Sequence, residues 1–151
     1  MSKMDEMAYV FGTIFTLSNR LQLLGDRLDA KLTVKQWLFL AGVIKCCHGA
    51  PTLSEVAAHI GTSRQNVKKI AAILEKQDFI RMERDPYDAR AIQINLTDMC
   101  RTHLKQREGM EQRFIEALFS GFNSEDVAVL ADMLKRLERN TNEIEKQLEE
   151  V

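Results

Sequence analysis

The densest group of side chains able to form directional hydrogen bonds lies at residues 64–69. This run holds arginine, glutamine, asparagine and two lysines, and no acidic residue precedes Glu75. Such side chains form bidentate or charge-assisted hydrogen bonds with base edges and phosphates in the major groove of duplex DNA. A solvated helix face would normally carry acidic residues as well. The candidate DNA-binding residues here are Ser63, Arg64, Gln65, Asn66, Lys68 and Lys69.

A second group lies in residues 81–97, RMERDPYDARAIQINLT. Polar and apolar residues alternate on both sides of the sequence DPYD, in which Pro86 favours a turn, so the stretch is predicted to form a β-hairpin. An arginine at the tip of such a hairpin can enter a narrow minor groove, and an acid two residues earlier can orient it. The candidate residues for contact with DNA in this hairpin are Arg84, Asp88 and Arg90.

Three N-terminal capping signals precede these groups. Thr33 with Gln36, and Thr52 with Glu55, are capping boxes that predict two helix starts. Gly61 is expected to end the helix that Thr52 begins, and the next helix should start at the capping residue Ser63. Two helices joined by this short turn form a helix-turn-helix pattern. With the hairpin directly behind them, they predict a winged helix.

Both ends of the chain carry apolar stripes with helical spacing. Residues 5–28 place apolar side chains three and four residues apart, and Phe11 and Phe15 widen that stripe. The C-terminal stripe follows one heptad frame and is interrupted at Thr141. It consists of Val127, Leu130, Leu134, Leu137, Ile144, Leu148 and Val151. One small domain cannot cover both stripes, so we expect them to build a homodimer interface.

The composition fits one mainly α-helical domain. The chain has 151 residues, of which 45% are hydrophobic, and only seven are glycine and two proline. The formal net charge is −1, but residues 63–90 hold seven basic residues against five acidic ones, whereas residues 123–151 hold four against eight. A nearly neutral chain can therefore still offer a basic surface to a polyanion. No apolar run reaches the length of a membrane span, and the start carries acidic residues where a signal peptide has basic ones, so a cytoplasmic protein is expected.

The remaining reactive residue types suggest no catalytic or metal chemistry. No Ser-His-acid set, glycine-rich phosphate loop or paired-carboxylate motif can be placed, so neither an enzyme nor a cofactor is expected. His48, His59 and His103 lack the short spacing of metal ligands, and no metal site is predicted. Three cysteines suit a reducing compartment, and Cys46, Cys47 and Cys100 are interpreted as thiols buried on helices.

Residues 52–97 resemble the DNA-binding core of the MarR (multiple antibiotic resistance regulator) family. The family's wing pattern is Asp, any residue, Arg, three residues, an aliphatic residue, any residue, Leu and Thr. It is met by Asp88, Arg90, Ile94, Leu96 and Thr97. Two positions depart from the family. Asp78 stands where glycine is usual, and aspartate tolerates the left-handed conformation; Ala89 replaces a frequent second arginine, which would weaken phosphate contact.

The resemblance implies a homodimeric transcriptional regulator, usually a repressor, that binds a pseudo-palindromic duplex operator and is released by a small effector. It implies a winged helix-turn-helix core at residues 32–97, flanked by dimerisation helices at 5–28 and 98–151, within one domain covering 1–151. Many family effectors are aromatic or phenolic acids. The residues at the corresponding place are Phe11, Phe15, Trp37 and Met110. Two alternatives stay open: a regulator that senses oxidants through cysteine, and a winged-helix protein-interaction module that does not bind DNA.

Overall fold

The computed structural model describes residues 1–46 and 49–150 and is mainly α-helical, with one two-stranded sheet. Cys47, His48 and Val151, to which the sequence analysis referred, lie outside the described residues. The described chain divides into two compact units, residues 1–106 and 107–151. The elements in order are α1 (Lys3–Gly25), α2 (Val34–Lys45), α3 (Leu53–Ile60), α4 (Arg64–Lys76), β1 (Ile80–Arg84), β2 (Ile92–Leu96), α5 (Asp98–Leu118) and α6 (Ser124–Glu149).

The predicted helix starts are confirmed. Thr33 Oγ1 accepts the backbone N–H of Gln36, whose side chain in turn accepts the N–H of Thr33, so the capping box of α2 is complete. Thr52 and Glu55 make the same reciprocal pair at α3. Gly61 ends α3 in the left-handed conformation, with φ of 70°. Short-range hydrogen bonds of this kind involve residues three apart, which is why sequence alone predicts them.

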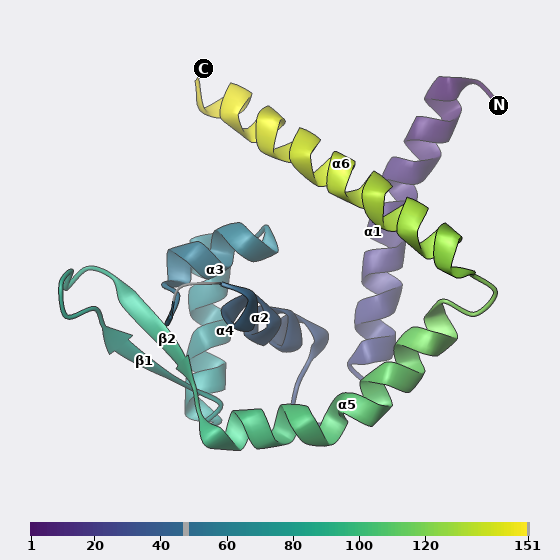
Figure 1. Ribbon diagram of the computed structural model, residues 1–151. Coiled ribbons are helices and arrows are strands. Elements are labelled where there is room, and N and C mark those ends of the chain that lie inside the picture. The colour runs from purple at the N-terminus through teal and green to yellow at the C-terminus, as the bar shows by residue number, and fades with distance from the viewer. Residues whose placement is uncertain (47–48, 151) are drawn as a thin grey trace. The chain divides into compact units, whose positions relative to one another are not determined.

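The winged-helix core is built from side chains of α2, α3, α4 and the hairpin. Figure 1 shows α2, α3 and α4 lying together beside the two strands. Phe39 and Leu40 of α2 and Leu74 of α4 are completely buried, and Ile80 and Ile94 bring one face of the sheet against them. On α4 the buried positions are those predicted to face inward: Val67, Ile70, Ala71 and Leu74.

The predicted hairpin is also confirmed. β1 and β2 pair antiparallel, with Ile80 opposite Leu96 and Arg84 opposite Ile92. The outer edge of β2 is joined to the start of α3, because the N–H of Ile94 donates to the carbonyl of Pro51 at 2.8 Å. Asp78 precedes β1 with φ of 62°, the left-handed conformation expected where the family usually has glycine.

Thr97 joins three elements at the base of the hairpin. Its hydroxyl donates to the carbonyl of Asp78 at 2.6 Å and accepts the backbone N–H of Cys100 at 3.1 Å. It therefore ties the turn after α4 to the first turn of α5. From the other side, Glu75 on α4 accepts the backbone N–H of Met82 on β1 at 2.7 Å. These bonds fix the hairpin relative to α4.

The first helix ends earlier than its apolar stripe. A helix over 5–28 was predicted, whereas α1 covers Lys3–Gly25 and leaves Leu28 in the following turn. At this end Gly25 is buried against Val34, so a larger residue there would clash with the Val34 side chain. Asp26 then accepts the backbone N–H of Val34 at 2.7 Å and links this turn to α2.

The two terminal helices expose most of their apolar side chains. In α6 no residue is buried, and its heptad positions from Val127 to Leu148 are between 37% and 72% exposed. In α1 the large apolar side chains are likewise exposed, with Phe11 at 67% and Phe15 at 57%. None of the helices in the described ranges is long and apolar enough to span a bilayer.

Candidate nucleic-acid interface

The outward face of α4 displays four of the candidate DNA-binding side chains. Arg64, Gln65, Lys68 and Lys69 are all exposed, and they fall into two i, i+4 pairs along the helix. The buried side of the same helix fixes this orientation, because Val67 and Ile70 pack into the core. Residues 64–69 thus present only positive charge and amide groups to solvent.

Ser63 and Asn66 organise the start of α4. Ser63 Oγ accepts the backbone N–H of Asn66 at 3.1 Å, which makes it the predicted N-cap. The side-chain amide of Asn66 donates to the hydroxyl of Thr62 at 2.9 Å, and its side chain is half-buried. Asn66 therefore also braces the turn between α3 and α4. This second contact joins residues only four apart, but the capping pattern alone did not indicate it.

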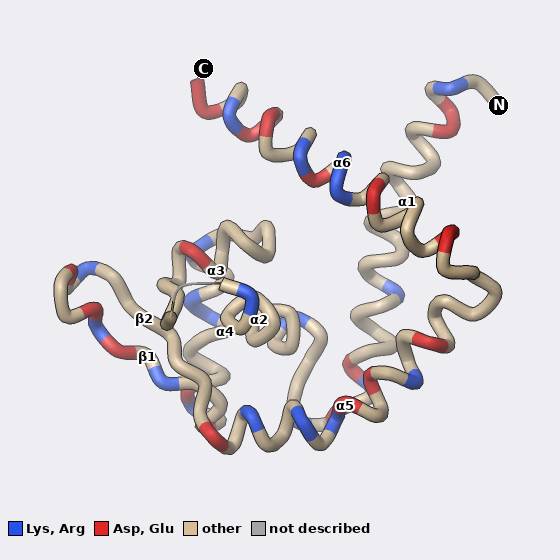
Figure 2. The backbone as a smooth tube through the Cα atoms, in the orientation of Figure 1, with Lys and Arg blue, Asp and Glu red and all other residues tan. Residues whose placement is uncertain are grey.

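The hairpin places Arg84, Asp88 and Arg90 around its exposed loop. The loop extends beyond the helices of the core (Figure 1). Asp88 Oδ1 accepts the backbone N–H of Arg90 at 3.0 Å, so the acid holds the arginine's main chain. No salt bridge among the described residues involves Arg84 or Arg90. Figure 2 shows basic and acidic residues interleaved along β1 and the loop that follows it, whereas β2 carries no charged residue.

Asp85 is the residue that orders this loop, and the sequence analysis did not select it. Its carboxylate accepts the backbone N–H of Tyr87 at 2.7 Å and that of Asp88 at 3.1 Å, and it also accepts the side-chain amide of Gln93 at 2.6 Å. The N–H of Tyr87 is the main cause that lowers the pKa of Asp85 below its usual value. The Asp-Pro sequence before the turn was a usable signal for this role.

Arginines from α4 and from the hairpin meet at one shallow depression. The depression has a volume of about 220 Å³ and lies where the start of α3, the start of α4 and the loop of the wing converge. Arg64 lines it from α4 and Arg90 lines it from the hairpin, together with Asp88. Thr52 and Ser54 complete its polar wall from α3, although sequence reasoning had not assigned either of them to the interface. The helix-turn-helix and the wing therefore form one continuous surface.

The four candidate effector-lining residues lie on three helices. Phe11 and Phe15 contact each other edge to face on α1, with ring centroids 5.1 Å apart, and both rings are more than half exposed. Trp37 on α2 and Met110 on α5 are half-buried. A second depression of about 360 Å³ is lined by residues of α2, β2 and α5, among them Val43, Leu96 and Arg101. None of the four candidate effector-lining residues lines it.

The cysteines differ in exposure. Cys100 is completely buried on α5, as predicted, and burial raises the pKa of its thiol to about 11, although the positive charge of Arg101 acts in the opposite direction. Cys46 departs from the prediction of a thiol buried on a helix. It is half-buried and follows the last residue of α2 in an extended conformation, because the helix ends at Lys45.

Cys100 is expected to resist alkylation in the folded protein. A thiol with a pKa near 11 is about one part in a thousand thiolate at pH 8, and only the thiolate reacts. Peptide mapping by mass spectrometry after iodoacetamide treatment at pH 8 should find Cys100 unmodified under native conditions and modified in urea. Cys46 is the internal control. Equal native rates at Cys46 and Cys100 would contradict the buried environment of Cys100.

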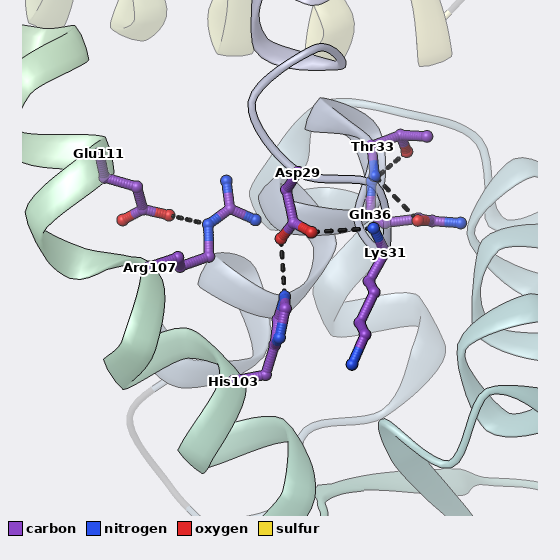
Figure 3. Close-up of polar contacts among 7 residues, drawn as sticks. All are labelled: Asp29, Lys31, Thr33, Gln36, His103, Arg107 and Glu111. Atoms are coloured by element: carbon purple, nitrogen blue, oxygen red, sulfur yellow. Dashed lines mark hydrogen bonds and ion pairs between the residues drawn. The ribbon is translucent and has the colours of Figure 1, made fainter.

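The described histidines belong to no group of three metal-ligating side chains. His103 Nε2 lies 2.7 Å from Asp29 Oδ2, and the same carboxylate accepts the backbone N–H of Lys31 at 2.8 Å (Figure 3). This contact ties α5 to the turn after α1, and His103 also packs edge to face on Phe79. Residues 1–46 and 49–150 contain no group of three His, Cys, Asp or Glu side chains able to hold a metal ion.

The core of the chain matches a known protein family and a known relative. The MarR family model matches residues 32–92, which run from just before α2 to the first residue of β2. YdgJ of Bacillus subtilis, described as an uncharacterised HTH-type transcriptional regulator, is 29% identical over 72 residues. That match covers 48% of this chain and 44% of the relative, less than half of its length.

Solved structures share the fold at low sequence identity. A MarR protein from Peptoclostridium difficile is 22% identical, with 87% of this chain and 86% of that chain covered and a TM-score of 0.78. BpsR of Bordetella bronchiseptica, whose DNA binding is regulated by 6-hydroxynicotinic acid, is 19% identical, with coverage of 85% and 92% and a TM-score of 0.74. These likenesses confirm the winged helix-turn-helix architecture.

Proposed function

We propose that the chain is a MarR-family transcriptional repressor that binds a duplex operator as a homodimer, because the family model matches its residues 32–92. Helix α4 enters the major groove, where Arg64, Gln65 and Asn66 contact base edges. Lys68 and Lys69 contact phosphates. The wing arginines Arg84 and Arg90 lie along the adjacent backbone and minor groove. A chain that binds operator DNA in this way would act in the cytoplasm.

The observation that carries this proposal is the shared depression of α4 and the wing. Arg64 and Arg90 come from segments separated by 25 residues of chain, yet they line the same polar hollow. The exposed face beside it, on α4, has basic and amide side chains and no carboxylate through residue 74. Such a surface matches a polyanion whose charge is regularly spaced. A repeated operator half-site follows from two-fold symmetry, because each subunit presents one such surface.

The proposal includes release of the operator by a small aromatic or phenolic acid. Its support is the family and the example of BpsR, whose DNA binding responds to 6-hydroxynicotinic acid. The residues proposed to line the effector site are Phe11, Phe15, Trp37 and Met110. Apolar rings with a few polar groups nearby suit an aromatic acid. Isothermal titration with aromatic carboxylic acids, followed by displacement of bound duplex, tests this part.

The direct test of DNA recognition compares Gln65 with Lys69. A preferred duplex is first selected from a random library by the full chain. Gln65→Ala should weaken binding to that duplex by about 1–3 kcal/mol and leave binding to random duplex nearly unchanged, because a base-edge contact is lost. Lys69→Ala should weaken both alike and reduce the slope of log affinity against log salt by about 1. Fluorescence anisotropy across a salt series measures both quantities.

The two variants control for each other, since both change one exposed residue on the same face of α4, one turn apart. Neither side chain contributes to the core, so both variants should unfold at the parent's temperature. Equal loss by Gln65→Ala on preferred and random duplex would remove Gln65 from sequence recognition.

A further inference from the structure

Tyr87 is not among the candidate DNA-binding residues. It is the most exposed large aromatic or apolar side chain of the described residues, at 97%. It lies in the loop between β1 and β2, immediately after Pro86. An aromatic ring offers a large contact area with only two rotatable bonds, and its hydroxyl adds a polar group at the far end. A ring in this position has no neighbour within the chain to cover it.

The main chain that carries Tyr87 is held by hydrogen bonds on both sides. Asp85 accepts the backbone N–H of Tyr87 and of Asp88. The N–H of Asp85 donates to the carbonyl of Ala91 at 2.9 Å, and the N–H of Ala91 donates to the carbonyl of Asp88 at 3.0 Å. Gln93 on β2 donates to the second oxygen of Asp85. The loop thus has a defined shape before any partner binds, which lowers the entropy cost of binding through it.

Two arginines flank Tyr87 and can face a polyanion. The two aspartates of the loop, Asp85 and Asp88, use their carboxylates to accept backbone N–H groups within the loop. Arg84 and Arg90 on either side are exposed and make no salt bridge within the described chain. Arg90 also lines the depression that it shares with Arg64 of α4. Tyr87 therefore continues the proposed DNA-binding surface at the tip of the wing.

We propose that Tyr87 contacts duplex DNA, packing its ring against the deoxyribose wall of the minor groove next to Arg90, and that Asp85 positions it there. This inference rests on the proposed function, because it requires that the wing lies on DNA. Side chains other than arginine do enter or line the minor groove from wings and arms of DNA-binding proteins. The contact is with sugars and not with base edges, so it should strengthen binding to many sequences.

The test uses the full chain and the preferred duplex selected above. Tyr87→Ala should weaken binding about tenfold, a typical result for losing one aromatic contact with nucleic acid. Tyr87→Phe should stay within about threefold of the parent, since the ring remains. The salt slope should equal the parent's, because no positive charge is lost. Met99→Ala, which removes an exposed apolar side chain outside the loop, is the matched control and should bind like the parent.

A second readout does not depend on any variant. Acetylation of tyrosine by N-acetylimidazole, mapped by mass spectrometry, should modify Tyr87 readily in the free protein and much more slowly in the DNA complex. Affinity of Tyr87→Ala equal to the parent's, or undiminished acetylation of Tyr87 in the complex, would overturn the inference. The proposed function would still stand if Gln65→Ala kept its selective loss. Failure of the parent to bind any duplex would overturn both.

The positioning role of Asp85 has its own readout. Asp85→Ala removes a negative charge near DNA, which by electrostatics alone should strengthen binding. We expect weaker binding instead, because the loop loses the acceptor that holds Tyr87. The double variant Asp85→Ala/Tyr87→Ala should be no weaker than Tyr87→Ala alone, since both changes remove the same contact. Additive losses, or tighter binding by Asp85→Ala, would overturn the positioning role.

Discussion

Leu134→Asp is expected to turn a stable homodimer into a monomer at micromolar concentration. Leu134 lies in the apolar stripe of α6, and half of its side chain is exposed in a single copy of the chain. The whole helix lacks a buried residue. A stripe of this length needs a partner surface, and a second copy with the same stripe supplies one. An aspartate at its centre would bury an unpaired charge at the interface.

Sedimentation velocity measures this result, and Asn142→Asp is the matched control. Asn142 is an exposed residue on the polar side of the same helix, and its change adds the same single charge. The control should remain a dimer. The Leu134→Asp monomer should also lose most of its operator affinity, because only one recognition helix can then bind at a time. A parent chain that sediments as a monomer would rule out the proposed interface.

Phe39→Ala is expected to lower the free energy of unfolding by about 3–5 kcal/mol. Phe39 is completely buried in the core of the winged helix. The lost ring would leave a cavity next to the residues that orient α4 and the sheet, and a typical domain has only about 5–15 kcal/mol of stability. Operator binding should fall in parallel at physiological temperature, because the recognition surface exists only in the folded core.

Chemical denaturation followed by circular dichroism measures the change, with Leu38→Ala as the control. Leu38 is the neighbouring residue on the same helix but is 42% exposed. Leu38→Ala should lower the free energy of unfolding by well under half as much as Phe39→Ala, because water already contacts much of the Leu38 side chain in the folded protein. Similar losses at both positions would mean that the core does not lie where the structure places it.

Local rules predicted most of the DNA-binding core. Thr33, Thr52 and Ser63 each cap a helix through an atom three residues away, so the sequence contains both partners. The wing was predictable for the same reason, because alternation and a Pro-containing turn are short-range patterns. The left-handed conformation of Asp78 followed from the family's glycine at that position.

The features that the sequence did not predict depend on contacts that no capping box or alternation pattern specifies. Gly25 at the end of α1 packs on Val34 of the next helix, and the side chain of Asn66 donates to Thr62. One of the hydrogen bonds that order the wing loop comes from Gln93 on β2, eight residues from Asp85. Residue types indicated which side chains suit DNA, but only the fold showed that Arg64 and Arg90 line one hollow.

The most direct measurement of DNA recognition by α4 and the wing is a hydroxyl-radical and base-methylation footprint of the full chain on its selected duplex. A dimer presenting two recognition helices predicts an inverted repeat, with two major-groove protections about 10 base pairs apart. Minor-groove protection where the wings lie should flank them, and Arg90→Ala should remove only these outer protections. Selection that yields no bound duplex at low salt would contradict the account and favour a winged-helix module that binds protein.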